Sequence, residues 1–280
     1  MQIALYVTLS CAVSANVPEE CITKPWYALG MQCPKAALFD LDDTLAESFQ
    51  APKPAVKASL SALQALIPVA IITGAGFERI EKDVLTGMDA ISSNFYLFPN
   101  SSAQCFMYAD GIWEMKYSLA LSEDERTQIK GAIQECLDSI DVLRDAPHFG
   151  EQVVDREAQI AFTVVGLEAP QEVKKGWDPD GTKRRTIVEI LNKKLDGFDI
   201  LIGGASTIDI TRQDINKAHG VEWFAKYLDM RPQEMLYLGD ALYEGGNDYV
   251  VIQTGIQTIS VANPGETAKI LEELVTVCAT

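Results

Sequence analysis

The outer thirds of the chain alternate short, mostly apolar runs with segments whose apolar residues recur every three or four positions. Such runs are typical of strands that are buried on both faces of a sheet. They predict strands at residues 35–39, 69–72, 96–98, 235–238 and 258–261. The spaced segments predict helices at residues 54–66, 77–85, 218–228 and 268–275. Because strands and helices take turns along the chain, we expect a parallel sheet covered by helices.

The middle third follows a different pattern. Residues Ser122 to Glu125 read SEDE, a capping box that predicts the start of a helix. Residues 159–165 alternate apolar and polar side chains, which is typical of a strand with one buried face. A helix over residues 182–195 and a strand over residues 198–202 are expected to follow. This part of the chain therefore predicts an α+β layer distinct from the parallel sheet.

The change of pattern predicts two domains. We expect an α/β core with a parallel sheet formed by residues 31–110 and 205–280, with residues 111–204 inserted as a separate α+β domain. If the inserted domain moves over the core, its hinges should lie near residues 108–112 and 203–207.

Residues 1–30 contain an apolar stretch, IALYVTLSCAVSA, of the length found in signal peptides. No Lys or Arg precedes it, whereas a secretory signal carries positive charge there. We therefore expect an N-terminal extension, either disordered or upstream of a true start at Met31.

Composition and charge argue against several classes of protein, namely nucleic-acid-binding, membrane-spanning and zinc-binding proteins. The 23 basic and 40 acidic residues give a net charge of −17, which would repel the phosphates of nucleic acids. No apolar run reaches the roughly 20 residues of a membrane span. The six cysteines form no C-x-x-C pair and only two histidines are present, so we expect no zinc site. Scattered cysteines in an enzyme-sized chain predict reduced thiols and a cytoplasmic location.

Polar side chains follow the predicted strands at their carboxyl ends. Asp40 and Asp42 follow the first strand, Thr73 follows the second, and Asp240 follows the strand that ends at residue 238. Lys217 begins the helix before that last strand. Ligand sites of parallel α/β sheets lie at this edge, so we expect these groups to meet. Crowded carboxylates repel one another unless a cation lies among them, and oxygen ligands without His or Cys favour Mg²⁺.

This set of groups is suited to phosphoryl transfer. One carboxylate can attack phosphorus and carry the group as an aspartyl phosphate, while a second protonates the leaving group and deprotonates water. A calcium-binding loop is excluded because Leu45 and Ala51 stand where an EF-hand needs Gly and Glu. A dinucleotide fingerprint fails because Arg79 stands at its third glycine position.

Four motifs in order resemble the haloacid dehalogenase-like superfamily of phosphotransferases. They are DLDDT at residues 40–44, ITGAG at residues 72–76, Lys217, and GDALYEGGND at residues 239–248. The resemblance implies a HAD-like Rossmannoid core with an inserted cap domain of the C2B type. Within that class, IGGASTIDIT at residues 202–211 is similar to eukaryotic-type phosphomannomutases and their bacterial relatives.

The resemblance also implies roles for individual residues. Asp40 would be the nucleophile and Asp42 the general acid and base, while Thr73 and Lys217 would hold the phosphoryl oxygens. Mg²⁺ would be held by the Asp40 carboxylate, the Asp42 carbonyl and Asp240, with Asp248 in support.

The cap of the phosphomannomutases binds a second phosphate through arginines, and this chain keeps only part of that pattern. Arg156 matches the first arginine and Lys174 falls near a third. Leu167 stands in place of the second, and Phe49 replaces an arginine that follows the first motif. The sugar-contacting residues would correspond to Thr207 and Asp209.

Because two phosphate contacts are missing, we expect a Mg²⁺-dependent phosphatase of a small phosphorylated metabolite, with a sugar phosphate as the expected class. The alternative is a phosphohexose mutase that interconverts hexose 1- and 6-phosphates. A third hypothesis is a catalytically silent sugar-phosphate sensor, against which the retention of both Asp40 and Asp42 speaks. The expected partner is a small-molecule phosphate ester, with no nucleic acid and no membrane, and a homodimer through the cap is left open.

Overall fold

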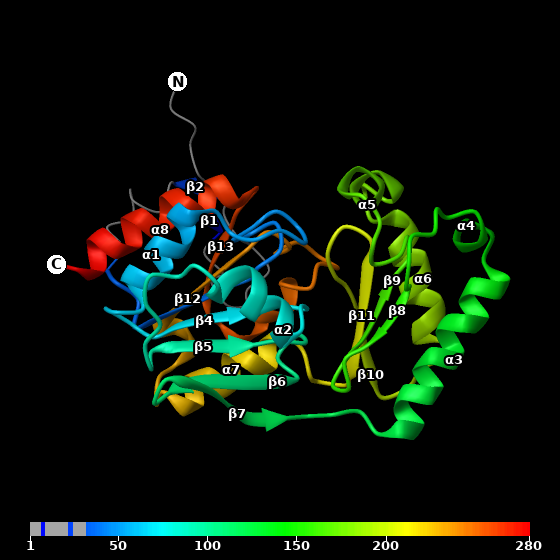
Figure 1. Cartoon of the computed structure of the whole chain (residues 1–280), viewed down its shortest axis with the longest axis horizontal. Helices are drawn as coiled ribbons and strands as arrows, with labels where there is room; N and C mark the ends of the chain where they lie inside the picture. The colour runs from blue at the N-terminus through cyan, green and yellow to red at the C-terminus, as the bar shows by residue number, and fades with distance from the viewer. Residues whose placement is uncertain (1–6, 9–21, 25–31) are drawn as a thin grey trace.

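The computed structural model describes residues 7–8, 22–24 and 32–280, and the expected extension at residues 1–30 lies mostly outside them. Two lobes lie side by side, a larger core and a smaller cap (Figure 1). The core is built on a seven-stranded sheet with the order β13-β12-β3-β4-β5-β6-β7. Its parallel strands are β3 (Ala36–Phe39), β4 (Val69–Ile72), β5 (Phe95–Phe98), β12 (Met235–Gly239) and β13 (Gln257–Ser260). These strands and their parallel pairing confirm the prediction from the apolar runs.

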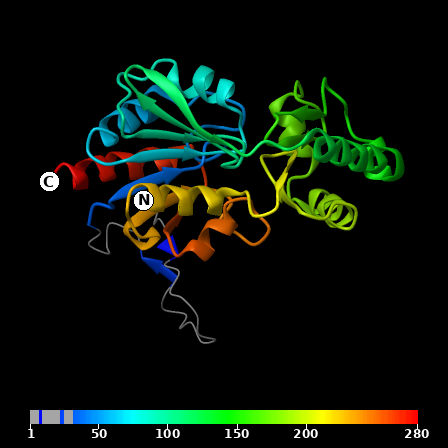
Figure 2. The ribbon, with the colours of Figure 1, turned by 90° about the horizontal axis from the view of Figure 1, so that it is seen from below.

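Helices cover both faces of this sheet (Figure 2). Alternate residues of β3 point to opposite faces, so Ala37 and Phe39 belong to one apolar cluster and Ala36 and Leu38 to another. The first cluster includes residues of α1 (Pro54–Leu63), α2 (Phe77–Ile80), the π-helical turn Glu81–Leu85 and α8 (Pro264–Cys278). The second includes residues of α7 (Lys217–Tyr227) and the 3₁₀ turn Tyr249–Thr254, and a further 3₁₀ turn spans Pro232–Glu234. Burial on both faces explains why β3, β4, β5 and β12 carry almost no polar residues, whereas the edge strand β13 carries three.

The cap is a four-stranded antiparallel sheet whose two longest helices lie on the face turned away from the core (Figure 1). Its strands, in the order β10-β11-β9-β8, are Phe198–Ile202, Thr207–Arg212, Ile160–Thr163 and Val153–Asp155. Its helices are α3 (Glu123–Ser139), α4 (Asp141–Arg144), α5 (Gln171–Trp177) and α6 (Thr182–Asn192). The capping box at Ser122 is confirmed. Ala161 and Thr163 of β9 are also buried, because the face expected to be wet turns toward the core.

The chain passes between the lobes at different points from those expected. The antiparallel strands β6 (Gln104–Ala109) and β7 (Ile112–Ser118) extend the core sheet past residue 111. Strand β11 pairs with β9 and β10, which keeps the chain in the cap sheet until Arg212. The crossing segments are therefore residues 119–121 and 213–215, and the hinges expected at residues 108–112 and 203–207 fall within or beside strands. The strands next to the two crossings, β7 and β11, are paired antiparallel and therefore lack the unbroken apolar runs of the parallel core strands.

The cysteines differ from the expectation of reduced thiols. Cys33 and Cys278 form a disulfide that joins the start of β3 to the end of α8. Cys105 and Cys136 are free and buried, and Cys11 and Cys21 lie outside the described residues. The expectation is wrong for the bonded pair because the fold brings residues 245 positions apart in sequence together beside one apolar cluster. In the described part of the chain, no helix combines the length and apolar character needed to cross a membrane.

Candidate active site between core and cap

The carboxyl ends of the core strands open into a cleft that the cap sheet covers. The cleft and the open solvent at its mouth together occupy about 940 Å³. Core residues that line it include Asp40, Asp42, Thr73 and Asp240, and cap residues include Arg156, Thr207 and Asp209. The structure thus brings together most of the residues that the sequence singled out, and Lys217, which does not line the cleft, hydrogen-bonds to Asp40.

Asp40 and Lys217 form the buried centre of the site. Lys217 Nζ donates to Asp40 Oδ1 at 2.6 Å and to Asp248 Oδ1 at 2.7 Å. Burial alone would lower the pKa of Lys217, but Asp248 and Asp40 together outweigh it and raise that pKa. The Lys217 side chain is therefore a fixed cation, placed at the first residue of α7. It engages one oxygen of Asp40, and no described side chain hydrogen-bonds to the other oxygen, Oδ2.

Asp248 is a support within this centre. Its Oδ1 also accepts from the Tyr237 hydroxyl at 2.5 Å, and its Oδ2 accepts from the Ala241 N–H at 3.1 Å. Tyr237 is fully buried on β12 and was not recognised from the sequence. It lies inside an apolar run, where a tyrosine is more often only part of the core.

Three carboxylates offer a site for a cation. Oxygens of Asp40, Asp240 and Asp248 lie within 4.8 Å of one another. Burial, followed by the neighbouring Asp248, raises the pKa of Asp240 to about 7, and burial also raises the pKa of Asp40. A divalent cation would offset the repulsion that contributes to these shifts, and the all-oxygen donor set is the one Mg²⁺ prefers. The residues therefore fit the predicted metal.

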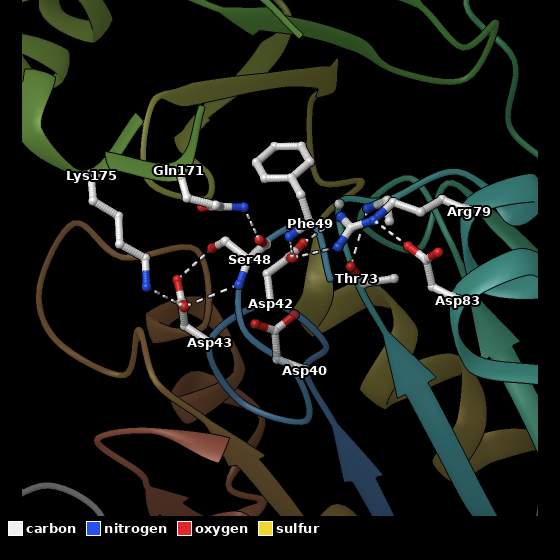
Figure 3. Close-up of polar contacts among 12 residues, drawn as sticks. Asp40, Asp42, Asp43, Ser48, Phe49, Thr73, Arg79, Asp83, Gln171 and Lys175 are labelled. Carbon is white, nitrogen blue, oxygen red and sulfur yellow. Dashed lines mark hydrogen bonds and ion pairs between the residues drawn. The ribbon is translucent and has the colours of Figure 1, made fainter. Parts of the chain in front are cut away.

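Asp42 is held by an arginine that the sequence did not identify as functional. Arg79 Nη1 donates to Asp42 Oδ2 at 2.7 Å, and Arg79 Nη2 donates to Asp42 Oδ1 at 2.6 Å (Figure 3). The Phe49 N–H donates to Asp42 Oδ1 at 2.8 Å. From the sequence, Arg79 was only the residue at which a dinucleotide-binding motif would need its third glycine. Its place one helical turn after the second motif is the signal that could have identified it.

Thr73 and Asp43 are two further polar residues near Asp42. Thr73 is buried at the end of β4, and its Oγ1 accepts from the Ala75 N–H at 3.1 Å. That bond leaves the hydroxyl hydrogen free to donate into the cleft. Asp43 points away from Asp40 and accepts from the Ser48 hydroxyl at 2.5 Å (Figure 3).

Arg156 and Asp209 bring the cap close to the core. Arg156 Nη1 donates to the carbonyl of Gly74, which follows Thr73. A Cβ atom at Gly74 would lie 2.5 Å from Asp209 Oδ2, and one at Gly203 would lie 2.7 Å from it. Only glycine at these two positions lets the Asp209 carboxylate approach. Burial raises the pKa of Asp209 to about 6, against the opposing effect of Arg156.

Thr207 and Lys174 differ in their access to the cleft. Thr207 lines it, and its buried Oγ1 has no hydrogen-bond partner in the described structure. Lys174 does not line the cleft: its Nζ donates to the Leu167 carbonyl at 2.8 Å and lies 3.7 Å from the centre of the Phe49 ring. The structure therefore does not bring Lys174 to the cleft, and its contact with substrate stays a prediction.

A second arginine, Arg184, lines the cleft and was not singled out. Its Nε donates to Asp178 at 2.9 Å, and its Nη1 donates to the carbonyls of Gly203 and Gly204. Arg184 thus fixes the turn that carries Gly203 beside Asp209.

With this geometry in place, the chain can be compared with known proteins. The sequence profile of the family Eukaryotic phosphomannomutase matches residues 56–277. The chain belongs to this family. Among curated members, the phosphomannomutase of Spinacia oleracea is 24% identical over 245 residues, which is 85% of this chain and 94% of that protein. Phosphomannomutase 2 of Dictyostelium discoideum is 25% identical over 248 residues, 84% of this chain and 94% of that protein.

Solved structures share the fold. The IMP-bound, N-terminally truncated IMP-nucleotidase of Plasmodium falciparum superposes with a TM-score of 0.63 at 20% identity, over 86% of this chain and 68% of that one. The sucrose-phosphatase of Synechocystis sp. superposes with a TM-score of 0.50 at 15% identity, over 82% and 83% of the two chains. At these identities the likeness shows the fold alone, and it confirms the α/β core with a cap.

Membership of the phosphomannomutase family confirms the resemblance to the haloacid dehalogenase-like superfamily. The protein is an enzyme of the phosphohydrolase or mutase type, and enzymes of this family use Mg²⁺. The names of the curated relatives agree better with the mutase alternative than with hydrolysis, which we expected first.

Proposed function

We propose that the protein is a Mg²⁺-dependent phosphatase of a small phosphate ester, a sugar monophosphate in the first instance, that acts through an aspartyl phosphate on Asp40. The observation that carries the proposal is the environment of Asp40. Lys217 engages Oδ1, none of the described residues hydrogen-bonds to Oδ2, and both Asp40 and Asp42 line the cleft. A nucleophile with one free oxygen beside a second carboxylate is what phosphoryl transfer needs.

In the first step, Asp40 Oδ2 attacks phosphorus and the bond from phosphorus to the sugar oxygen breaks. Asp42 gives its proton to that oxygen, so the sugar leaves as a neutral alcohol. The Thr73 hydroxyl donates to a phosphoryl oxygen, and Lys217 offsets negative charge near Asp40. Bound Mg²⁺ would supply charge neutralisation at the phosphoryl oxygens, held by the Asp40, Asp240 and Asp248 carboxylates and the Asp42 carbonyl.

In the second step, Asp42 takes a proton from a water molecule that attacks the phosphorus of the aspartyl phosphate. The acyl–phosphate bond breaks, inorganic phosphate leaves, and Asp40 returns as a carboxylate. The cap covers the cleft during the first step and limits the access of bulk water to it.

Hydrolysis is favoured over mutase activity by the engagement of the cations around the cleft. A mutase must hold a second phosphate away from Asp40. Arg156 is bonded to the Gly74 carbonyl, Arg184 to Asp178 and the 203–204 turn, and Arg79 to Asp42. Cap residues Val154, Ala161 and Leu167 add neutral surface. The unpartnered Thr207 hydroxyl and the Asp209 carboxylate are suited to sugar hydroxyls.

The phosphohexose mutase is the second candidate, because the family profile and the curated relatives are phosphomannomutases. One assay separates the two. Mannose 1-phosphate is supplied with a bisphosphorylated hexose activator, and free phosphate and hexose 6-phosphate are both measured over time. We expect free phosphate to dominate, and predominant 6-phosphate would refute the phosphatase in favour of the mutase.

The mechanism has its own test. Asp40→Asn should abolish turnover and leave the circular dichroism spectrum unchanged, while a matched Asp43→Asn variant should keep most activity because Asp43 points away from Asp40. Full activity in Asp40→Asn would reject the mechanism. Ligand binding without turnover in the native protein would favour the silent sensor instead.

A further inference from the structure

The carboxylate of Asp42 is restrained in one orientation. Each carboxylate oxygen can accept two hydrogen bonds. Oδ1 accepts from Arg79 Nη2 and from the Phe49 N–H, so both of its positions are filled. Oδ2 accepts from Arg79 Nη1 and keeps one position open among the described residues. Because Asp42 lines the cleft, this leaves a single oxygen of Asp42 able to exchange a proton there.

Arg79 is itself fixed from another side. Its Nε donates to Asp83 Oδ2 at 3.3 Å, one turn along the same helical segment. Its guanidinium carbon lies 4.9 Å from the centre of the Phe49 ring. The guanidinium plane is therefore set by a carboxylate and an aromatic ring, and both remaining nitrogens face Asp42 (Figure 3). Such a fork fixes a carboxylate plane in a way that a lysine ammonium cannot.

We propose that Arg79 is the positioning residue of Asp42, and that it directs Oδ2 of Asp42 to the oxygen of the leaving alcohol. The inference rests on the proposed function. Arg79 then acts through Asp42 and not by contact with the phosphate. Loss of the fork lets the carboxylate rotate, and the proton is delivered less efficiently to the departing oxygen.

The test compares two esters on the same protein sample. p-Nitrophenyl phosphate releases a phenolate that is stable without a proton, whereas mannose 6-phosphate releases an alkoxide that needs one. kcat/KM reports the steps up to loss of the alcohol. Arg79→Gln should lower kcat/KM for mannose 6-phosphate by about 10- to 100-fold more than for p-nitrophenyl phosphate, with KM little changed. The ratio of the two values does not depend on the fraction of folded protein.

Three variants accompany it. Arg79→Lys keeps the charge but not the fork, so it should resemble Arg79→Gln. Asp83→Asn loosens Arg79 without touching Asp42 and should give a smaller change in the same direction. Lys82→Gln removes an exposed cation from the same turn and should leave the ratio unchanged.

Two results would overturn the inference. An equal loss on both esters together with a raised KM would make Arg79 a direct phosphate ligand. Full recovery of the ratio in Arg79→Lys would show that charge alone suffices. Failure of the proposed function is recognised separately, because turnover of p-nitrophenyl phosphate would then persist in Asp40→Asn.

Discussion

At the scale of single residues, Asp209 carries the clearest pH signature. Burial raises its pKa to about 6 in the folded protein, above the ordinary value of 3.8. The folded state therefore binds this proton more tightly than the unfolded state. Its contribution to stability is full below about pH 4, falls as the pH rises toward 6, and stays low above that.

Asp209→Asn removes the buried charge, so the variant should gain stability relative to the native protein as the pH rises. We expect a gain on the order of 3 kcal/mol at pH 8 and little difference at pH 4. Urea unfolding at the two pH values measures it. If the native protein is more stable than Asp209→Asn at pH 8, the prediction is wrong. The attraction between Asp209 and Arg156 would then outweigh the cost of burying the Asp209 charge. Phosphatase activity on sugar esters should fall in the same variant.

Asp240 tests the metal site. Bound Mg²⁺ stabilises the folded state by mass action, so millimolar Mg²⁺ should raise the melting temperature of the native protein measured in EDTA. Asp240→Asn should lose most of that rise, because it removes one of three converging carboxylates. Asp199→Asn, an acidic residue of the cap sheet, is the matched control. An unchanged Mg²⁺ response in Asp240→Asn would place the ion elsewhere.

The sequence allowed the core residues of the site to be predicted because strand ends of a parallel sheet converge. Asp40, Thr73 and Asp240 each follow an apolar run, and their meeting place follows from topology. The roles of Arg79 and Lys174 could not be predicted in this way. Both residues lie on helices, where the direction of the side chain decides what it contacts. Arg79 turns into the cleft, whereas the Lys174 ammonium turns to a carbonyl and a ring.

At the scale of elements, the cap helix α5 contacts the core loop of residues 43–50. Gln171 Nε2 donates to the Ser48 carbonyl, and Lys175 pairs with Asp43 at 3.6 Å (Figure 3). Lys175 also pairs with Glu47 at 2.9 Å. Lys174 adds its contact with the Phe49 ring. Since Phe49 also donates to Asp42, this helix connects cap position to the site.

Lys174→Met keeps the length of the side chain and removes its charge. The variant should weaken the contact between α5 and the core loop, so backbone hydrogen exchange at residues 47–50 should become faster. It should also lower kcat/KM for sugar esters by a few fold. Lys175→Gln loses ion pairs of a half-exposed ammonium with Glu47 and Asp43, each worth about 0–1 kcal/mol, and should change the loop less than Lys174→Met does. If Lys174 bound substrate instead, KM would rise strongly while hydrogen exchange in the loop stayed as in the native protein.

Element prediction succeeded where burial on both faces leaves an unbroken apolar run, as in β4. It failed at the hairpin of β6 and β7, where β7 is an edge strand with exposed and half-buried side chains. Such a strand carries no run to distinguish it from the cap that follows. The domain boundary was therefore drawn one strand early, although the existence of an inserted domain could be inferred.

At the scale of the whole molecule, the disulfide between Cys33 and Cys278 ties the two ends of the core together. The C-terminus lies at the end of the core far from the cap (Figure 1). Neither cysteine lines the cleft. The bond should therefore affect stability without affecting the chemistry.

Cys278→Ser should lower the free energy of unfolding by about 2–4 kcal/mol, because the bond closes a long loop in the unfolded chain. A drop of several degrees in melting temperature follows, with kcat at 25 °C unchanged. Reductant should lower the melting temperature of the native protein to a similar extent and leave Cys278→Ser unaffected. Cys136→Ser, which alters a buried free thiol of the cap, should keep its response to reductant. If reductant has no effect on the native protein, the predicted contribution of the bond to stability is wrong.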